Sequence, residues 1–256
     1  MWAVPNDRKP FIAFMVALIA LAWLALWVWG HSPYGRFLSH EELGEVGESG
    51  AFLLLFVAGW TVMVVAMMLP TSLPLVMLFH TFTRQRQDRA RLVGLLIAGY
   101  LGVWALFGGI AHLADWRLHE AVEQNEWLEA NVWIIGAGTI ALAGLYQFTP
   151  LKYYCLEKCR SPLSFIMGHW RGRHEAMRSF WLGMHHGLFC LGCCWSLMLL
   201  MFAVGVGSVG WMLVLGAVMA VEKNMPWGRR LSVPLGVVLL WWALVLAVGN
   251  VPTASM

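Results

Sequence analysis

Long stretches without a charged residue constrain this chain more than any other feature of its sequence. A helix needs about 20 mostly apolar residues to cross the hydrocarbon of a bilayer. Because only 12% of the residues are charged and 60% are hydrophobic, the chain lacks the polar side chains that cover a soluble protein. The sequence predicts an all-α, polytopic transmembrane helical bundle in a lipid bilayer. The runs free of Asp, Glu, Lys and Arg include 11–29, 51–79, 92–114, 130–151, 179–221 and 231–256.

The run at 179–221 is long enough for two helices. It has 43 residues, and Gly205, Gly207 and Gly210 lie near its middle. Glycine tolerates the backbone conformations of tight turns. We therefore expect two helices joined by a turn at these glycines.

The run at 51–79 exceeds one span by a smaller margin. Pro70 and Pro74 lie in its last third, and proline ends or kinks a helix. We expect the helix to end near residue 70, with 75–79 as a kinked or interfacial extension; a helical hairpin is the alternative. The sequence thus predicts one transmembrane domain, residues 1–256, of about seven helices near 11–29, 51–70, 92–114, 130–150, 179–204, 208–225 and 231–250.

Basic residues alternate between successive connectors. Lys and Arg concentrate in cytoplasmic loops, which predicts a cytoplasmic N-terminus and an outside C-terminus in an inner (plasma) membrane. The first run is long for a secretory signal and no small-residue cleavage motif follows it, so we expect a retained helix. Contact with anionic headgroups explains the basic clusters, and no nucleic-acid partner is expected. The clusters are Arg8 and Lys9; Arg84, Arg86, Arg89 and Arg91; Lys152, Lys158, Arg160, Arg171, Arg173 and Arg178; and Lys223, Arg229 and Arg230.

Three of the five cysteines lie within five positions, shortly after two histidines. These are His185, His186, Cys190, Cys193 and Cys194. Residues three and four apart share one face of a helix, so His186, Cys190 and one of the later cysteines form a stripe. Thiolate and imidazole bind Cu(I) and Zn(II) tightly, whereas the alternative is that the thiols only pack as small apolar groups. The pattern predicts a metal site, with Cu(I) favoured and zinc as the second choice.

Two further sulfur groups are candidates for the same chemistry. Met63 and Met67 lie one turn apart in the second helix, followed by Met68, and thioether is a ligand of Cu(I) but a poor one for zinc. Ordinary packing is the alternative. Cys155 and Cys159 lie on the cytoplasmic side, where a structural disulfide is not expected. They predict a metal-accepting or redox-active dithiol, against two interfacial cysteines without a role.

Two ionisable residues lie at the end of the sixth predicted helix. Glu222 and Lys223 would reach the inner edge of the hydrocarbon. Ionisable residues at that depth are often functional. A boundary pair with a snorkelling lysine is the alternative.

With these residues in view, the chain resembles a bacterial family of predicted metal-binding integral membrane proteins, a domain of unknown function sometimes labelled copper chaperone. The resemblance runs from the second to the sixth predicted helix and implies metal binding. It rests on Trp60, Met63, Ala66, Met67, Met68 and Pro70; on Tyr146, Gln147, Pro150, Leu151, Lys152, Cys155, Cys159, Arg160 and Pro162; on His186, Gly187, Cys190, Leu191, Gly192, Cys193, Cys194, Trp195 and Met198; and on Met219, Glu222 and Lys223.

The preferred interpretation is a membrane metal-handling protein, a carrier more than an enzyme. It would bind Cu(I) in the fifth helix and pass it to or from Cys155 and Cys159, serving a membrane cuproprotein or another metal chaperone. One alternative is a redox protein that uses these thiols, or haem held by His80, His185 or His186. The other is a metal transporter.

Overall fold

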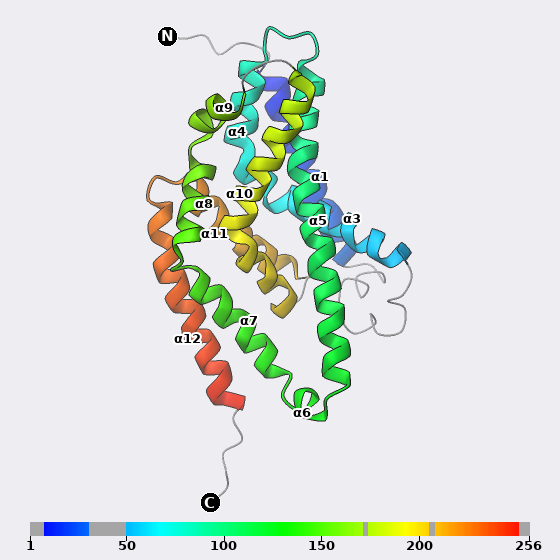
Figure 1. The fold of residues 1–256 in the computed structure, drawn as a ribbon, viewed down its shortest axis with the longest axis vertical. Coiled ribbons are helices and arrows are strands. Elements are labelled where there is room, and N and C mark those ends of the chain that lie inside the picture. Colours follow the sequence, from blue (N-terminus) through cyan, green and yellow to red (C-terminus); the bar gives the residue numbers. More distant parts are fainter. Residues whose placement is uncertain (1–7, 31–49, 171–173, 205–207, 251–256) are drawn as a thin grey trace, which may run out of the picture.

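The chain folds into an elongated bundle of helices. The computed structural model describes residues 8–30, 50–170, 174–204 and 208–250, and no strand occurs within these ranges. The longest helices, α5 and α10, run along the long axis, and α7 and α12 lie side by side in its lower half (Figure 1). The elements are α1 (Arg8–Gly30), α3 (Gly50–Met67), α4 (Leu69–Phe82), α5 (Arg89–Glu123), α6 (Glu126–Glu129), α7 (Trp133–Tyr146), α8 (Pro150–Arg160), α9 (Pro162–His169), α10 (Glu175–Val204), α11 (Val209–Asn224), η3 (Gly228–Leu231) and α12 (Ser232–Asn250).

Several of these helices have the length and apolar character of membrane spans. Four qualify on their own, namely α1, α5, α10 and α12 with η3, and the count rises to six if each of two bent helix pairs forms one span. The sixth predicted helix, near 208–225, corresponds to α11, which has 16 residues and is not among these candidates. Of the glycines expected to form the turn before it, Gly205 and Gly207 lie outside the described residues, and Gly210 lies in α11. The described part of the chain therefore has the character of a polytopic membrane protein.

The second predicted helix breaks at Met68. Here α3 ends and α4 begins, with an angle of 69° between them. Pro70 lies in the first turn of α4, where its missing N–H costs nothing, but it would interrupt the hydrogen bonds of a continuous helix. The extension expected at 75–79 belongs to α4, which continues through Pro74 to Phe82.

A second helix break, between α7 and α8, places the side chain of Lys152 in the interior of the bundle. The helices α7 and α8 meet at 64°, and Pro150 starts α8 while the Thr149 hydroxyl accepts a hydrogen bond from the Lys152 amide. Lys152 is fully buried. Its prediction as a loop residue is therefore wrong, because the bend makes the first turn of α8 part of the bundle.

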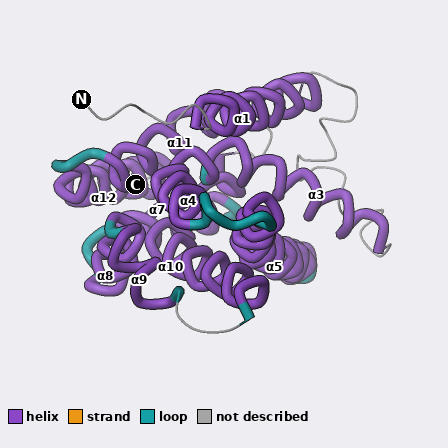
Figure 2. Tube along the Cα trace, turned by 90° about the horizontal axis from the view of Figure 1, so that it is seen from above, coloured by secondary structure: helices purple, strands orange, loops and turns teal. Residues whose placement is uncertain are grey.

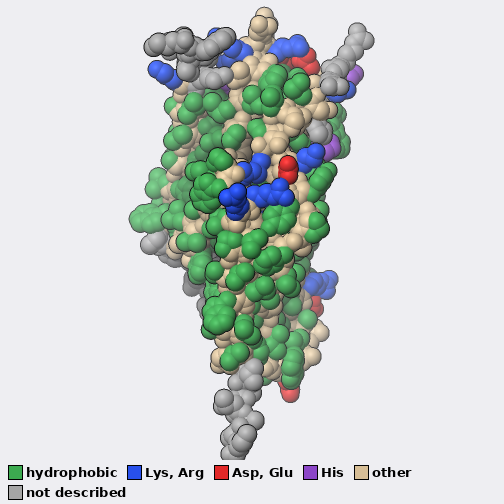
Figure 3. Space-filling model, turned by 90° about the vertical axis from the view of Figure 1, so that its left-hand side faces the viewer, with side chains coloured by type: hydrophobic (Ala, Val, Ile, Leu, Met, Phe, Trp, Pro, Cys, Tyr) green, Lys and Arg blue, Asp and Glu red, His purple; other side chains and the backbone are tan. Residues whose placement is uncertain are grey.

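The surface is largely apolar, as expected for contact with lipid. Hydrophobic side chains cover most of one long side, while Lys and Arg gather at the upper end and in one patch partway down (Figure 3). In α8 and η3 the basic residues include Lys158, Arg160, Arg229 and Arg230. Arg229 forms an exposed ion pair with Glu157 at 3.4 Å.

The helix α10 occupies a central position in the bundle. Seen from above, it lies beside α5 and α8, with α4 close by and α1 at the periphery (Figure 2). It packs on α5 backbone to backbone: a Cβ atom at Gly183 would overlap the carbonyl oxygen of Leu96, and one at Gly99 would overlap that of Phe180. Small residues permit such close approach of membrane helices.

Substituting Gly183 by alanine is expected to destabilise the bundle. The new methyl group would meet rigid backbone, and overpacking of this kind typically costs about 1–3 kcal/mol. Thermal unfolding in detergent measures the loss. Gly94→Ala is the matched control, because a Cβ atom added to Gly94 in α5 would have no neighbouring atom within 4 Å. If Gly183→Ala unfolds at the temperature of Gly94→Ala, the close α5–α10 contact is not a source of stability.

Candidate metal centre

Three sulfur atoms surround the ammonium group of Lys223 inside the bundle. The Lys223 Nζ atom lies 3.0 Å from Cys190 Sγ, 3.7 Å from Met68 Sδ and 3.8 Å from Cys194 Sγ. It also donates to the Thr71 hydroxyl at 3.3 Å. We call Met68, Cys190 and Cys194 the three-sulfur cluster; all three side chains are at most 1% exposed.

The cluster forms where three parts of the fold meet. Cys190 and Cys194 lie one turn apart on α10, Met68 comes from the α3–α4 break, and Lys223 comes from the end of α11. The Sγ atom of Cys194 lies 3.8 Å from Met68 Sδ and 2.9 Å from the Cys190 carbonyl oxygen. Cys193 donates to the same carbonyl at 3.0 Å.

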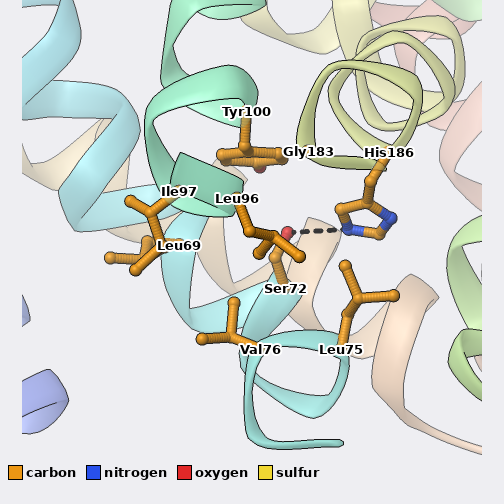
Figure 4. Close-up of a pocket in the computed structure, with 9 residues that line it drawn as sticks. All are labelled: Leu69, Ser72, Leu75, Val76, Leu96, Ile97, Tyr100, Gly183 and His186. Atoms are coloured by element: carbon orange, nitrogen blue, oxygen red, sulfur yellow. Dashed lines mark hydrogen bonds between the residues drawn. The ribbon is translucent and has the colours of Figure 1, made fainter. Parts of the chain in front are cut away.

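His186 lies beside this cluster and is linked to it through Tyr100. Its Nε2 atom is 3.2 Å from the Ser72 hydroxyl of α4, next to a small cavity of about 10 Å³ (Figure 4). The Tyr100 and His186 rings stack with their centroids 5.7 Å apart. The Tyr100 hydroxyl lies 3.0 Å from Cys190 Sγ. The Nδ1 atom of His186 is buried and has no hydrogen-bond partner among the described residues.

The two cysteines of α8 also face α10. The Cys159 side chain interacts with that of Cys193. A Cβ atom at Gly192 would lie only 2.6 Å from Cys155 Sγ, so glycine at this position leaves room for the thiol. Cys155 is buried and Cys159 half-buried. All five thiols of the chain are thus gathered between α8 and α10 or at the adjoining three-sulfur cluster.

The remaining candidates are His185, Met63 and Met67, and the two methionines belong to the same apolar cluster as Met68, Cys190 and Cys194. The His185 Nδ1 atom is 2.9 Å from the Trp181 carbonyl oxygen, and the residue is partly exposed. Met63 and Met67 are buried in the apolar core. There, a Cβ atom added to Gly216 on α11 would lie 3.6 Å from the Met67 side chain, an ordinary packing distance. Met68, at the break between α3 and α4, brings its Sδ atom to 3.8 Å from Cys194 Sγ.

The residues that sequence reasoning missed are polar groups within apolar runs. Thr71, Ser72 and Tyr100 all contact the cluster or His186. One available signal was Pro70, since the helix break that it favours identifies the neighbouring Met68 and Thr71 as candidates. No comparable pattern distinguishes Tyr100 from an ordinary aromatic residue of a span.

Glu222 and Lys223 are neighbours in the chain but contact different groups inside the bundle: Lys223 contacts the three-sulfur cluster, and Glu222 pairs with Lys152. The Glu222 Oε1 atom accepts hydrogen bonds from Lys152 Nζ at 2.7 Å and from the Ser232 hydroxyl at 2.6 Å. Lys152 also donates to the Gln147 side chain. Both Glu222 and Lys223 are buried, so neither snorkels to the surface as a boundary pair would.

The chemistry of the donor set suits a soft monovalent metal. Among the described residues no group of three or more His, Cys, Asp and Glu side chains is arranged to hold a metal ion. The cluster instead combines two thiols with one thioether, and soft sulfur ligands of these two kinds select Cu(I). The donors fit Cu(I) as a cargo.

A comparison with known families agrees with this chemistry. A family model described as a copper chaperone (PpoB2) matches residues 57–246, from α3 into α12. The match contains the three-sulfur cluster, Lys223 and both α8 cysteines. No curated protein and no solved structure matches the chain. Since the matched segment is well over half of its 256 residues, the chain belongs to this copper chaperone family.

Proposed function

We propose that this protein is a membrane copper chaperone that holds Cu(I) in the three-sulfur cluster of Met68, Cys190 and Cys194. The observation that carries the proposal is that these three buried sulfur atoms already surround a cationic group, the ammonium of Lys223, at 3.0–3.8 Å. Thiolate and thioether donors give such a site its preference for Cu(I). Burial keeps water and competing ligands from the ion.

The thiols between α8 and α10 would exchange the ion with this site. Cys159 is half-buried and interacts with Cys193, and Cys193 is followed in the chain by Cys194 of the cluster. Cu(I) would pass by ligand exchange, in which each new sulfur–copper bond replaces an old one without a change of oxidation state. Cys159 would form the outer end of this path, and the buried Cys155, beside Gly192, would offer a further thiol.

The proposed protein crosses a bacterial inner membrane seven times, with its N-terminus in the cytoplasm and its C-terminus outside. The α11 helix would be the sixth span in chain order and would bring the six candidate spans to seven. The start of α1 and the end of α12 lie at opposite ends of the long axis, which supports opposite sides for the two termini (Figure 1). The recipient would be a membrane cuproprotein or a second metal chaperone.

Loading kinetics test the proposed path. Detergent-purified protein is mixed anaerobically with Cu(I) held by a chromophoric chelator, and the chelator absorbance is followed. The wild type should take up about one Cu(I) per chain, as expected for a single low-coordinate sulfur site. Cys159→Ser/Cys193→Ser should reach the same stoichiometry but load roughly tenfold more slowly, which corresponds to about 1.4 kcal/mol in the transfer barrier.

Met63→Leu is the control for this measurement, because it alters a buried sulfur of the core outside the cluster. It should load at the wild-type rate. If the double serine variant also loads at that rate, the path through Cys159 and Cys193 is wrong while the binding site stands. If the wild type takes no Cu(I) from the chelator, the proposed function itself is wrong.

A further inference from the structure

We infer that Lys223 makes this site selective for a monovalent cation, by supplying the positive charge that balances a metal ion held by two thiolates. The inference rests on the proposed function and concerns the selectivity of the same site. Its basis is the set of charges buried around the cluster. Of these, Lys223 is the one that contacts the sulfur atoms directly.

The nearby carboxylate does not compensate Lys223. Glu222 forms its ion pair with Lys152 at 2.7 Å and accepts a further hydrogen bond from Ser232. Lys152 and Glu222 therefore balance each other. Among the ion pairs of the described residues, none involves Lys223. The groups that accept its hydrogen bonds are uncharged thiol, thioether and hydroxyl groups when no metal is bound and the thiols carry their protons.

The charge of the loaded site depends on the ion. Binding of one Cu(I) by the two thiols forms two sulfur–copper bonds and releases two protons, which leaves a complex with one negative charge. The Met68 thioether adds a donor without adding charge. With the ammonium of Lys223 beside it, the loaded cluster is neutral.

A divalent ion reverses this balance. Zn(II) with the same two thiolates gives a neutral complex, so the ammonium remains as an uncompensated charge a few ångströms from the metal. Such a charge in a low-dielectric interior is strongly unfavourable. Lys223 therefore favours Cu(I) over Zn(II) beyond the preference that the sulfur donors have by themselves.

The position of the ammonium group suits this role. In the metal-free protein it donates to the same sulfur atoms that would hold the ion. The four-carbon stem of lysine is flexible, so Nζ can leave the sulfur atoms when the metal takes its place. The Thr71 hydroxyl, 3.3 Å from Nζ, can keep the ammonium close enough to balance the complex.

The test compares affinities for two metals in full-length, detergent-purified variants. Cu(I) and Zn(II) affinities are each measured anaerobically by competition with chromophoric chelators. Lys223→Leu removes the charge and adds no sulfur or other donor that could bind the metal. We expect its ratio of Cu(I) to Zn(II) affinity to fall at least about tenfold below the wild-type ratio, the effect of roughly 1.4 kcal/mol. Lys223→Arg keeps the charge and should retain most of the preference.

The matched control is Lys158→Leu, which removes an exposed lysine from α8 and should leave the ratio unchanged. If Lys223→Leu yields no folded protein, Lys223→Gln takes its place in the comparison. A neutral variant that unfolds at the wild-type temperature and keeps the wild-type ratio overturns the inference. So does a Lys223→Arg ratio as low as that of the neutral variant. Absence of Cu(I) binding in the wild type would instead overturn the proposed function.

Discussion

Replacing Cys190 and Cys194 together by serine is expected to abolish tight Cu(I) binding. These thiols are the two anionic donors of the three-sulfur cluster, and a serine hydroxyl is a much harder ligand that Cu(I) disfavours. The binding free energy of structural zinc sites, roughly 10–16 kcal/mol, is divided among a few ligands. Loss of two thiolates on that scale predicts a decrease in affinity of at least about a thousandfold. Elemental analysis after loading and desalting should find little copper per chain.

Methionine substitutions provide the controls for this prediction. Met68→Leu removes one neutral donor and should weaken Cu(I) binding by about tenfold, since each factor of ten corresponds to about 1.4 kcal/mol. Met63→Leu and Met67→Leu change sulfur atoms in the apolar core and should leave affinity unchanged. A Cys190→Ser/Cys194→Ser variant that retains the wild-type copper content would show that the ion binds elsewhere.

Replacing Lys152 by methionine is expected to cause the largest loss of stability. The substitution leaves the Glu222 carboxylate buried, with the Ser232 hydroxyl as its one remaining side-chain partner among the described residues. Removing one member of a buried ion pair typically costs about 3–5 kcal/mol. The loss should appear in denaturant or thermal unfolding of the detergent-purified protein.

Two further variants separate charge from packing in this result. Lys152→Met/Glu222→Met removes both charges and should recover much of the loss, because buried ion pairs are often replaceable by apolar side chains. Arg229→Met breaks the exposed pair with Glu157 and should cost less than about 1 kcal/mol. If Lys152→Met is no more harmful than Arg229→Met, the buried pair contributes little to the fold.

The membrane spans could be predicted from the sequence because a helix that crosses hydrocarbon must be apolar along its length. Apolar runs without charge predict spans regardless of tertiary contacts. The directions of side chains at a break between two helices cannot be predicted from apolar runs in this way. Periodicity selected Met63 and Met67 as a pair, whereas Met68, at the 69° bend between α3 and α4, has the sulfur atom that contacts Cys194 and Lys223.

The interior charges show a second limit of sequence reasoning. Lys152 follows an apolar run and so had the pattern of a boundary charge, although Glu222, seventy positions later, pairs with it inside the bundle. Long-range partners of this kind depend on how α8 and α11 pack. The cysteine-rich stretch was easier to interpret because its residues share one helix, whereas Tyr100 and Thr71 reach them only through the tertiary fold.

The glycine contact between α5 and α10 restricts the movement of α10, which carries Cys190 and Cys194, more than that of the elements that carry Met68 and Lys223. Carbonyl oxygens of each helix abut glycines of the other, so α10 cannot slide or roll on α5 without collision. We therefore expect both thiols of the cluster to stay in place while the proposed cargo is delivered. Met68 lies at the α3–α4 break and Lys223 lies on α11, and we expect release to begin with a displacement of these two elements.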